Sequence, residues 1–329
     1  MALKFFKGTV PIVIVVISII FIAVWTPLFF SNTTVSYNNP MPLYGLLEHL
    51  TGSKIWISNI VAALICAALA FLITILNTTH FFINERTFVP ALIFILFTAL
   101  LPQYQALNPA LPASFFIVFA IKRILESYRK QGVAYNFFDA GILIGTGSLF
   151  YTNLIWFGTL IFIAVVLFRG INIKEIAVSI LGLITPYLVM FGIYYLLDYD
   201  LNELFSLIYN NLFSNAASFT FSKLTVAALI FILIVIVFCL GQMILFQNVK
   251  KIKSQKTFFL LTWMIFITIS VYLFVPSASY EIIWILGIPV SYFITHYLIF
   301  SKKKILPEIF FNTFFLVVLV IQVIQVFWR

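Results

Sequence analysis

Charged side chains are scarce in this sequence. Only 9% of its 329 residues are Asp, Glu, Lys or Arg, whereas 63% are apolar. A soluble domain carries about 25% charged residues and needs a polar shell around a core of limited size. The composition therefore excludes a soluble globular protein. Lipid is the expected solvent for most of the chain, which makes this a polytopic membrane protein.

Residues that bind metals or form disulfides are also few. The chain has two cysteines, Cys66 and Cys239, and three histidines, His49, His80 and His296, all far apart. No HExxH motif, phosphate-binding P-loop or Cys/His cluster with metal-ligand spacing is present. We therefore expect no metal and no cofactor other than a bound lipid or polyprenyl phosphate. Both cysteines lie inside apolar runs, where we interpret them as packed thiols.

Long apolar runs fill most of the sequence. A transmembrane helix needs about 20 apolar residues, and somewhat fewer when it is sheltered inside a bundle. Eleven runs meet this description, at residues 9–30, 55–78, 87–102, 112–127, 136–150, 153–169, 176–198, 224–247, 257–275, 281–300 and 308–328. The third to the sixth are short, which indicates tilt, partial re-entry or extension by their flanks. The predicted fold is an all-α transmembrane helix bundle, one domain over residues 1–329, whose first span is a retained signal anchor.

Basic residues predict the orientation of the chain. If the N-terminus is inside, sixteen of the 19 Lys and Arg residues fall on the cytoplasmic side, and only Lys54, Lys223 and Arg329 fall outside. This bias follows the positive-inside rule and places the C-terminus outside. The basic segment 122–132 is expected among anionic lipids at the cytoplasmic face. Basic residues gathered at membrane boundaries give no reason to expect a nucleic-acid partner.

The polar gap between the first two runs contains a short amphipathic helix. In residues 41–51, apolar side chains recur with helical spacing at Leu43, Leu46, Leu47 and Leu50. Pro42 suits a first helical position and Gly52 suits a C-terminal cap. We expect this helix to lie in the membrane interface on the outer side.

A second outer gap, residues 198–223, repeats this pattern. Its apolar stripe is formed by Leu201, Leu204, Phe205 and Ile208. Asp200 and Glu203 have the spacing of a capping-box-like helix start. A second outer interfacial helix is therefore predicted over residues 200–211.

Small residues and prolines indicate how the spans pack and bend. The segment GILIGTGS at residues 141–148 allows a neighbouring helix to approach closely. Pro186 and Pro289 predict kinks in the seventh and tenth runs. Many transporter sites are built from broken helices in matching positions of two halves, but the first half of this chain has no matching pair.

Polar side chains inside the spans are informative, because each is costly without a partner. Asp139 lies near the cytoplasmic end of its run, where it suits a helix start or reaches Lys130. His296 is interpreted either as a hydrogen-bonded packing residue or as a proton relay. Gln322 and Gln325 are three residues apart on one helix face, and we expect them to bond neighbouring helices.

Acidic residues of the two outer gaps are the candidate catalytic residues. Glu48, Asp200 and Glu203 are side chains that serve as general bases and as oxygen ligands. The structural alternative is that they form the polar faces and the cap of two interfacial helices. Both interpretations remain open from the sequence.

Two long segments carry a family resemblance. They are FFINERTFVPALIFILFTALLPQYQALNPALPASFFIVFAIKRIL at 81–125 and NFFDAGILIGTGSLFYTNLIWFGTLIFIAVVLFRG at 136–170, the second continuing into LITPYL at 183–188. They resemble an uncharacterised family of Bacteroidota polytopic inner-membrane proteins. The resemblance implies a multi-pass protein of the bacterial inner membrane and covers the full chain.

A second resemblance is one of topology. The predicted arrangement is similar to that of membrane glycosyltransferases that use polyprenyl-phosphate sugars, which cross once from the inside and then place interfacial helices in an outer loop. That loop carries an acidic residue, usually Asp, in the family. Here Glu48 is the only acid of the loop, and it stands within the amphipathic helix rather than directly after the first span. The resemblance implies that Glu48 acts as the base.

Three functions are compatible with these features. The first is envelope biogenesis, in which the protein acts as a transferase or a carrier on a lipid or a lipid-linked glycan at the outer leaflet. The second is a non-enzymatic subunit or scaffold that binds another membrane protein. The third is a small-molecule transporter. Whether the protein is an enzyme stays open at this point.

Overall fold

A computed structural model shows that helices and short connections make up the residues that it describes. These residues are 11–29, 39–52, 54–128, 132, 134–170, 172–214, 222–246, 251–301 and 305–327. Within these ranges there are thirteen α-helices, three short 3-10 helices and one π-helix, and there is no strand. The all-α prediction is confirmed.

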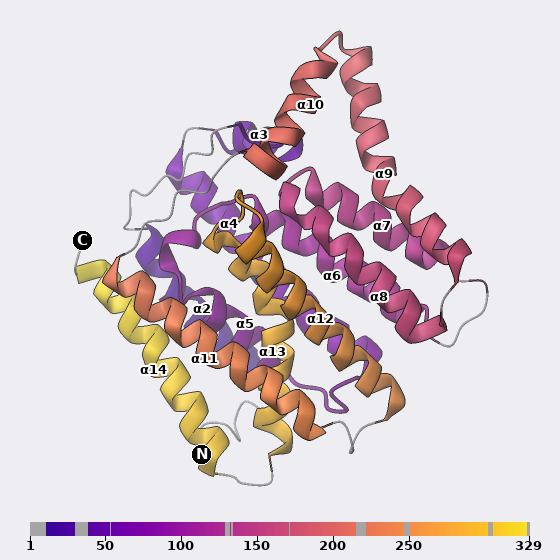
Figure 1. Cartoon of the computed structure of the whole chain (residues 1–329). Coiled ribbons are helices and arrows are strands. Elements are labelled where there is room, and N and C mark those ends of the chain that lie inside the picture. The colour runs from indigo at the N-terminus through magenta and orange to yellow at the C-terminus, as the bar shows by residue number, and fades with distance from the viewer. Residues whose placement is uncertain are drawn as a thin grey trace.

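The helices follow one another with short connections (Figure 1). The α-helices are α2 (Pro11–Phe29), α3 (Pro42–Thr51), α4 (Ile55–His80), α5 (Val89–Thr98), α6 (Ala110–Glu126), α7 (Ala134–Ser148), α8 (Gly158–Arg169), α9 (Ile173–Leu196), α10 (Leu201–Tyr209), α11 (Lys223–Phe246), α12 (Ile252–Phe274), α13 (Ile283–Phe300) and α14 (Ile305–Phe327). The short helices are η1 (Pro102–Tyr104), η2 (Thr152–Phe157), η3 (Asn210–Ser214) and η4 (Tyr280–Ile282). Of the described helical segments, eight are long and apolar enough to cross a membrane.

Each of the eleven expected runs contains a helix, but four of these helices are short. α5 has 10 residues, α6 has 17, α7 has 15 and α8 has 12, whereas a helix that spans a membrane alone needs about 20. η2 extends α8 into an 18-residue apolar segment, Thr152–Arg169. Burial explains the length of α5, because all of its side chains lie inside the bundle and none meets lipid. The eight longer segments are the candidate crossings of a polytopic bundle. Two of them, α9 and the segment that contains α13, continue through Pro186 and Pro289.

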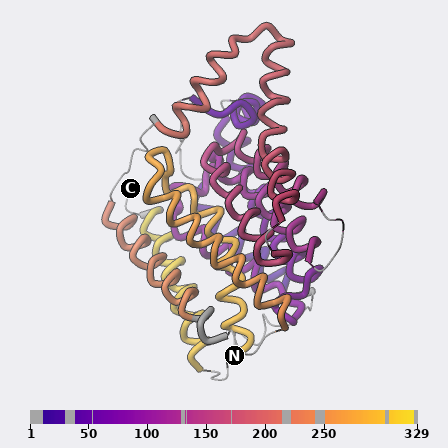
Figure 2. The backbone as a smooth tube through the Cα atoms, turned by 45° about the vertical axis from the view of Figure 1, so that its right-hand side comes forward, coloured from indigo at the N-terminus to yellow at the C-terminus, as the bar shows by residue number. Residues whose placement is uncertain are grey.

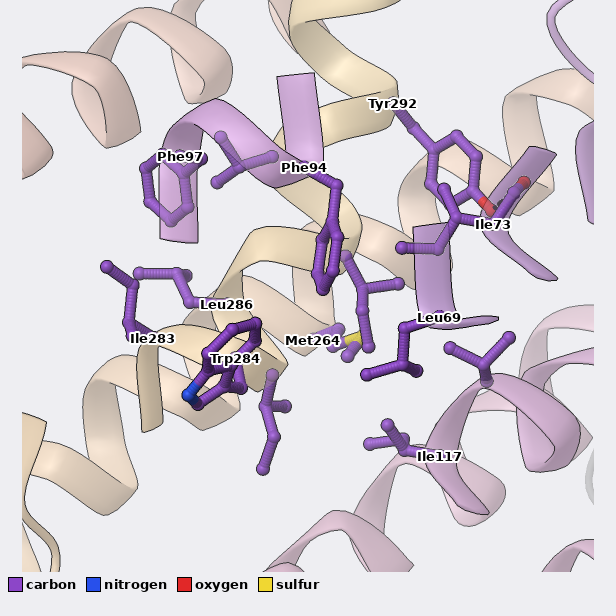
Figure 3. Packing of buried hydrophobic residues seen from close by; sticks show 14 of the residues in the cluster. Leu69, Ile73, Phe94, Phe97, Ile117, Met264, Ile283, Trp284, Leu286 and Tyr292 are labelled. Atoms are coloured by element: carbon purple, nitrogen blue, oxygen red, sulfur yellow. Dashed lines mark hydrogen bonds between the residues drawn. The ribbon is translucent and has the colours of Figure 1, made fainter. Parts of the chain in front are cut away.

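The central helix of the bundle is α13. Of the most apolar 18-residue stretch within Tyr280–Phe300, 94% is buried inside the bundle. Figure 3 shows Trp284 and Tyr292 of α13 among side chains of α4 and α5, and the rings of Trp284 and Phe94 are centred 6.1 Å apart. The Tyr292 hydroxyl donates a hydrogen bond to the carbonyl of Ile73 at 2.7 Å. Apolar packing and a buried hydrogen bond together fix α13 against α4 and α5.

Glycines form the seam along which α7 and α9 pack. A Cβ atom added at Gly141 would lie 2.5 Å from the carbonyl oxygen of Ser179, and one added at Gly182 would lie 2.4 Å from that of Phe138. Real Cβ atoms essentially never come within 3.0 Å of such atoms. The two backbones therefore approach more closely than any other residue type allows, which confirms the packing predicted from the small residues of α7.

The two ends of the bundle are distinct. The start of α2 lies at one end and the finish of α14 at the other (Figure 1, Figure 2). α3 and α10 lie at the same end as the C-terminus. We call this the outer end, because the charge bias predicts that it faces outside, and the opposite one the inner end. Of the residues predicted to be outside, Lys54 directly precedes α4 and Lys223 begins α11, both at the outer end.

Helices are present at both places where interfacial helices were predicted, as α3 and α10. Asp200 caps α10, because its carboxylate accepts a hydrogen bond from the Asn202 amide at 2.8 Å. α10 does not lie flat over the bundle. Instead α9 extends beyond its neighbours, and α10 turns back from its tip towards α3 (Figure 2). α9, α10, the start of α3 and the end of α7 together form a small second core of Met41, Leu149, Met190 and Leu204.

Charged side chains at the inner end form ion pairs. Arg123 of α6 lies 3.4 Å from Asp139 in the second turn of α7, measured from Nε to Oδ2. The acid predicted at this end therefore has Arg123 as a partner, while Lys130 is outside the described residues. Arg169 and Glu175 join the end of α8 to the start of α9, with Nη2 and Oε1 3.0 Å apart. The Glu175 side chain is only 4% exposed, so this pair is a buried one.

Candidate functional site

The acidic residues singled out from the sequence lie at the outer end but not together. Glu48 is half-buried on α3. Asp200 and Glu203 are exposed at the corner between α9 and α10, which is the apex of the molecule (Figure 1). α3 lies beside the opposite end of α10 in the same view. The structure therefore separates Glu48 from the other two candidates.

The histidine and the cysteines of the spans are packed inside the bundle. His296 of α13 lies between two rings, with centroid distances of 5.2 Å to Phe258 and 4.8 Å to Phe300. Cys66 and Cys239 are buried free thiols, as the apolar runs around them predicted. The surroundings of His296 agree with the packing interpretation, whereas a proton relay stays a prediction.

The two glutamines of α14 differ in burial: Gln322 is buried and Gln325 is half-buried. The Gln322 side-chain amide donates hydrogen bonds to the carbonyl of Ala99 at 2.8 Å and to Oε1 of Gln105 at 3.2 Å. These bonds tie α14 to the segment after α5, which confirms the predicted role of Gln322. Gln325, one turn further along, is half-buried.

An acid that the sequence did not single out is buried at the outer end. Glu281 is 4% exposed and lies in η4, directly before α13. Burial is the main cause of the raised pKa values of Tyr44, Tyr104 and Tyr151, and the negative charge of Glu281 raises each of them further. The pKa of Tyr104 rises to about 12. Tyrosines from three different segments therefore lie within range of the charge of one carboxylate.

The position of Glu281 in the sequence conceals its burial. It is the first residue of the predicted span 281–300, where an acid is expected to face water and headgroups. A 3-10 helix points successive side chains in different directions. Tyr280 and Ile282 face an apolar groove, and Glu281 between them is turned into the bundle. The only sequence signal is an acid beside one tyrosine, Tyr280, at the edge of an apolar run.

Tyr44 connects Glu281 with the sequence candidate Glu48. Its hydroxyl donates a hydrogen bond to the carbonyl of Leu107 at 3.2 Å. The charges of Glu48 and Glu281 both raise the pKa of Tyr44, after the larger effect of burial. Two carboxylates from distant parts of the chain thus act on one phenol. We call the outer cluster the group of Tyr44, Glu48, Tyr104, Tyr151, Tyr280 and Glu281.

Ring contacts and hydrogen bonds hold the outer cluster in place. The rings of Tyr104 and Tyr280 meet edge to face, with centroids 5.8 Å apart. The Trp284 indole donates a hydrogen bond to the carbonyl of Tyr104 at 3.1 Å. The Ser277 hydroxyl donates to the side-chain oxygen of Asn153 at 3.0 Å, which fixes the turn between α12 and η4 to η2. These contacts join η1, η2 and η4 to α13 around the cluster.

The outer cluster offers the groups needed to bind and deprotonate a hydroxyl. Carboxylates accept hydrogen bonds and phenols donate them. A positioned carboxylate can also remove a proton from a substrate hydroxyl. Among the described residues, no group of three or more His, Cys, Asp or Glu side chains is arranged to hold a metal ion.

An apolar groove opens beside the outer cluster. It lies between α11, α12 and the start of α13, has a volume of about 340 Å³, and is called groove A. On α11 its lining residues are Leu229, Ile232, Leu233 and Ile236. Tyr272 and Tyr280 also line it, with ring centroids 6.0 Å apart. Since α11 and α12 are candidate membrane crossings, groove A opens towards lipid.

Ionisation of Tyr104 tests the arrangement of the outer cluster. Its pKa is raised from 10.0 to about 12 by burial and then by the charge of Glu281. The folded protein therefore keeps this phenol neutral where an exposed one would ionise. We expect its contribution to stability to be complete below pH 10 and lost as the pH rises from 10 to about 12. The difference in tyrosinate absorbance between wild type and Tyr104→Phe measures the titration.

Removing the charge of Glu281 should lower the pH at the midpoint of the Tyr104 titration. In Glu281→Gln the burial remains but the repulsion from the carboxylate is gone, so Tyr104 ionises at lower pH. Glu203→Gln removes the same charge at the α9–α10 corner and should leave the midpoint unchanged. Equal midpoints in the two variants would contradict the proximity of Glu281 to Tyr104.

Comparisons with known proteins place the chain in a family without naming an activity. The model of a family of unknown function matches residues 40–327. No curated protein and no solved structure matches the chain. The geometry of the outer end is therefore the basis for assigning a function.

Proposed function

The chain belongs to DUF6427, a family of unknown function, and we propose that it binds a lipid or a lipid-linked glycan at its outer end and acts in envelope biogenesis. The outer end is proposed to face the outer leaflet of the bacterial inner membrane. The observation that carries this proposal is groove A beside the outer cluster. The groove would take the hydrocarbon chain of the ligand, and the cluster would meet its headgroup.

The lining of groove A supports the assignment of a hydrocarbon chain. Burial of each methylene group contributes about 0.8 kcal/mol, and the groove presents aliphatic side chains from two candidate membrane crossings. Its polar side chains are Thr268, Tyr272 and Tyr280. The Thr268 hydroxyl already donates to the carbonyl of Met264 at 2.7 Å. A chain in groove A would therefore point its polar head towards the two tyrosines and η4.

A transferase reaction at this place would use the acids of the outer cluster. A carboxylate takes the proton of an acceptor hydroxyl, whose oxygen forms a bond to the anomeric carbon of the lipid-linked sugar. The bond from that carbon to the lipid phosphate breaks, and the phosphate leaves with the electron pair. Glu281 is proposed as one carboxylate and Glu48 as the other. The topological likeness to polyprenyl-phosphate-sugar glycosyltransferases, with an acid in the first outer loop, supports Glu48.

Filling groove A tests the proposal. Leu233→Trp is expected to lower the amount of co-purifying lipid about tenfold, because an indole ring excludes a segment of the hydrocarbon chain. Native mass spectrometry of the protein in a gentle detergent measures the bound lipid. Ile234→Trp is the matched control, since Ile234 is the next residue of α11, is 58% exposed and is not a lining residue of groove A. Equal lipid binding by the two variants would rule out groove A as the chain site.

Acid-to-amide variants then separate binding from transfer. Glu281→Gln and Glu48→Gln should keep the bound lipid but fail to complement a deletion strain at normal protein abundance. Asp200→Asn and Glu203→Gln remove acids at the α9–α10 corner and should complement. The reverse pattern would move the catalytic acids to that corner. Full complementation by all four variants would contradict the proposed transferase reaction.

A non-enzymatic subunit is the second candidate function, and one surface favours it. On α10 and η3, an exposed apolar stripe is formed by Leu201, Phe205, Tyr209 and Phe213. Exposed apolar surface of this kind meets a protein partner or the membrane interface. If the stripe binds a membrane protein, crosslinking in membranes should give a stoichiometric complex that Phe205→Ser abolishes. A monomer in wild-type membranes would contradict this function.

A further inference from the structure

A second groove lies on the opposite face of α12. It has a volume of about 400 Å³ and is called groove B. The residues of α12 that line it are Trp263, Phe266, Ile267, Ser270, Val271 and Phe274. Groove A is lined on the same helix by Thr268, Ile269, Tyr272 and Leu273. At about 3.6 residues per turn these two sets lie on opposite sides of α12.

The other walls of groove B come from η2, α8 and η3. Trp156 and Thr159 form the first wall, and Leu212 and Phe213 of the π-helix form the second. A π-helix is wound more widely than an α-helix, and such turns occur frequently at functional sites. The rings of Tyr209 and Phe213 remain close across this turn, with centroids 5.5 Å apart.

Two contacts fix the frame around groove B. The side-chain amide of Asn211 donates a hydrogen bond to the carbonyl of Asn39 at 3.0 Å, which ties η3 to the segment before α3. The bond from Ser277 to Asn153 ties the turn after α12 to η2. The groove is therefore bounded by anchored segments on both sides.

The two grooves converge on one turn at the outer end. Groove A reaches Leu273 and Tyr280, and groove B reaches Phe274 and Pro276. These residues flank the short connection between α12 and η4. Chains that lie in the two grooves would therefore bring their polar heads to the same turn, beside Glu281.

We propose that groove B binds a second lipid chain, so that the protein holds two lipids at once, one on each face of α12. The inference rests on the proposed function, because it supplies the partner for the lipid in groove A. A reaction or an exchange between two lipid-borne groups needs both heads at one place. The turn between α12 and η4 provides that place.

The walls of groove B indicate the chemical class of its ligand. Groove A is mainly aliphatic, whereas five aromatic residues line groove B: Trp156, Phe213, Trp263, Phe266 and Phe274. Aromatic rings offer large, flat apolar faces, which suit the double bonds and methyl branches of a prenyl chain. Trp156 is 37% and Trp263 is 39% exposed, on segments that are candidate membrane crossings. Groove B is therefore open to a prenyl chain that arrives from the lipid.

Photolabelling tests this inference. The full-length protein is placed in phosphatidylethanolamine vesicles with geranylgeranyl phosphate that carries a diazirine at its chain end, and the labelled residues are mapped by mass spectrometry. We expect label on Trp263 and Phe266. In Ser270→Trp this label should fall about tenfold, because the added ring fills groove B. Val166→Trp is the control, since Val166 is 51% exposed on α8 and lines neither groove.

A second photoprobe distinguishes ligand binding in groove A from ligand binding in groove B. A phosphatidylethanolamine with a diazirine in its acyl chain should label Leu233 and Ile269 of groove A, and Ser270→Trp should not reduce that label. If Ser270→Trp leaves the prenyl label unchanged, the second site is wrong while the proposed function stands. If neither probe labels its groove more than the α8 surface around Val166, the proposed function is wrong as well. Ser270→Trp and Val166→Trp should both unfold at the wild-type temperature. A loss of label in Ser270→Trp then reports a loss of ligand binding rather than a loss of folding.

Discussion

Replacing Gly182 by alanine should lower the free energy of unfolding by about 2 to 3 kcal/mol, the upper part of the range of roughly 1 to 3 kcal/mol that is typical of overpacking a core. The added Cβ atom would lie 2.4 Å from the carbonyl oxygen of Phe138 and 3.2 Å from the Cα atom of Gly141. Both are backbone atoms, which cannot rotate away as a side chain can. α9 must therefore move away from α7 along the whole seam. Unfolding in micelles, followed by tryptophan fluorescence, measures the change.

Gly192 on the same helix supplies the matched control. A Cβ atom added there meets nothing within 4 Å, and alanine is a better helix former than glycine by roughly 0.5 to 1 kcal/mol. Gly192→Ala should therefore leave the stability unchanged or raise it slightly. Both variants make the same glycine-to-alanine change on α9. If Gly182→Ala lowers the stability while Gly192→Ala does not, the close approach of α7 at Gly182 is the cause. Equal effects would show that the seam is looser than described.

Loss of the buried ion pair at the inner end should have an effect of similar size. Arg169→Gln removes the partner of Glu175, whose side chain is 4% exposed. Among the described residues, Oε2 of Glu175 has no hydrogen-bond partner, so this carboxylate depends on Arg169. Removing one member of a buried pair leaves an uncompensated charge and costs about 3 kcal/mol or more. The same unfolding measurement in micelles detects it.

Two further variants separate this charge effect from a loss of packing. In the double variant Arg169→Gln with Glu175→Gln no buried charge remains, so much of the stability should return. Arg123 pairs with Glu126 and Asp139, whose side chains are 26% and 39% exposed. Arg123→Gln should therefore cost less than about 1 kcal/mol. A double variant as unstable as Arg169→Gln alone would assign the loss to packing rather than to charge.

The helices were predictable because lipid imposes length and periodicity on the sequence. The spacing of Leu43, Leu46, Leu47 and Leu50 predicted α3, and the acid spacing at Asp200 predicted the start of α10. Gln322 was predicted to bond a neighbouring segment because an amide in an apolar span needs a partner. The lipid surroundings determine each of these features locally. A single stretch of sequence is therefore enough to predict each one.

The outer cluster and the two grooves were not predictable in this way. Glu281 stands at the edge of an apolar run, and only the direction of η4 decides whether it faces water or the bundle. The grooves depend on which faces of α12 meet α11 and η3, and residues far apart in the sequence determine that packing. The total burial of α5 has the same origin, because its short apolar run, residues 87–102, could equally belong to a tilted crossing.

The enclosure of α5 bears on how the protein is made. About 185 residues separate the end of α5 from the start of α13, the helix against which it packs, and a ribosome adds them in roughly 10 to 40 s. During that interval α5 is too short to cross the bilayer alone, and α13 has not yet been synthesised. α14, which also packs against α5, follows later still. The core around α5 is therefore completed only when the last two helices of the described chain have been added.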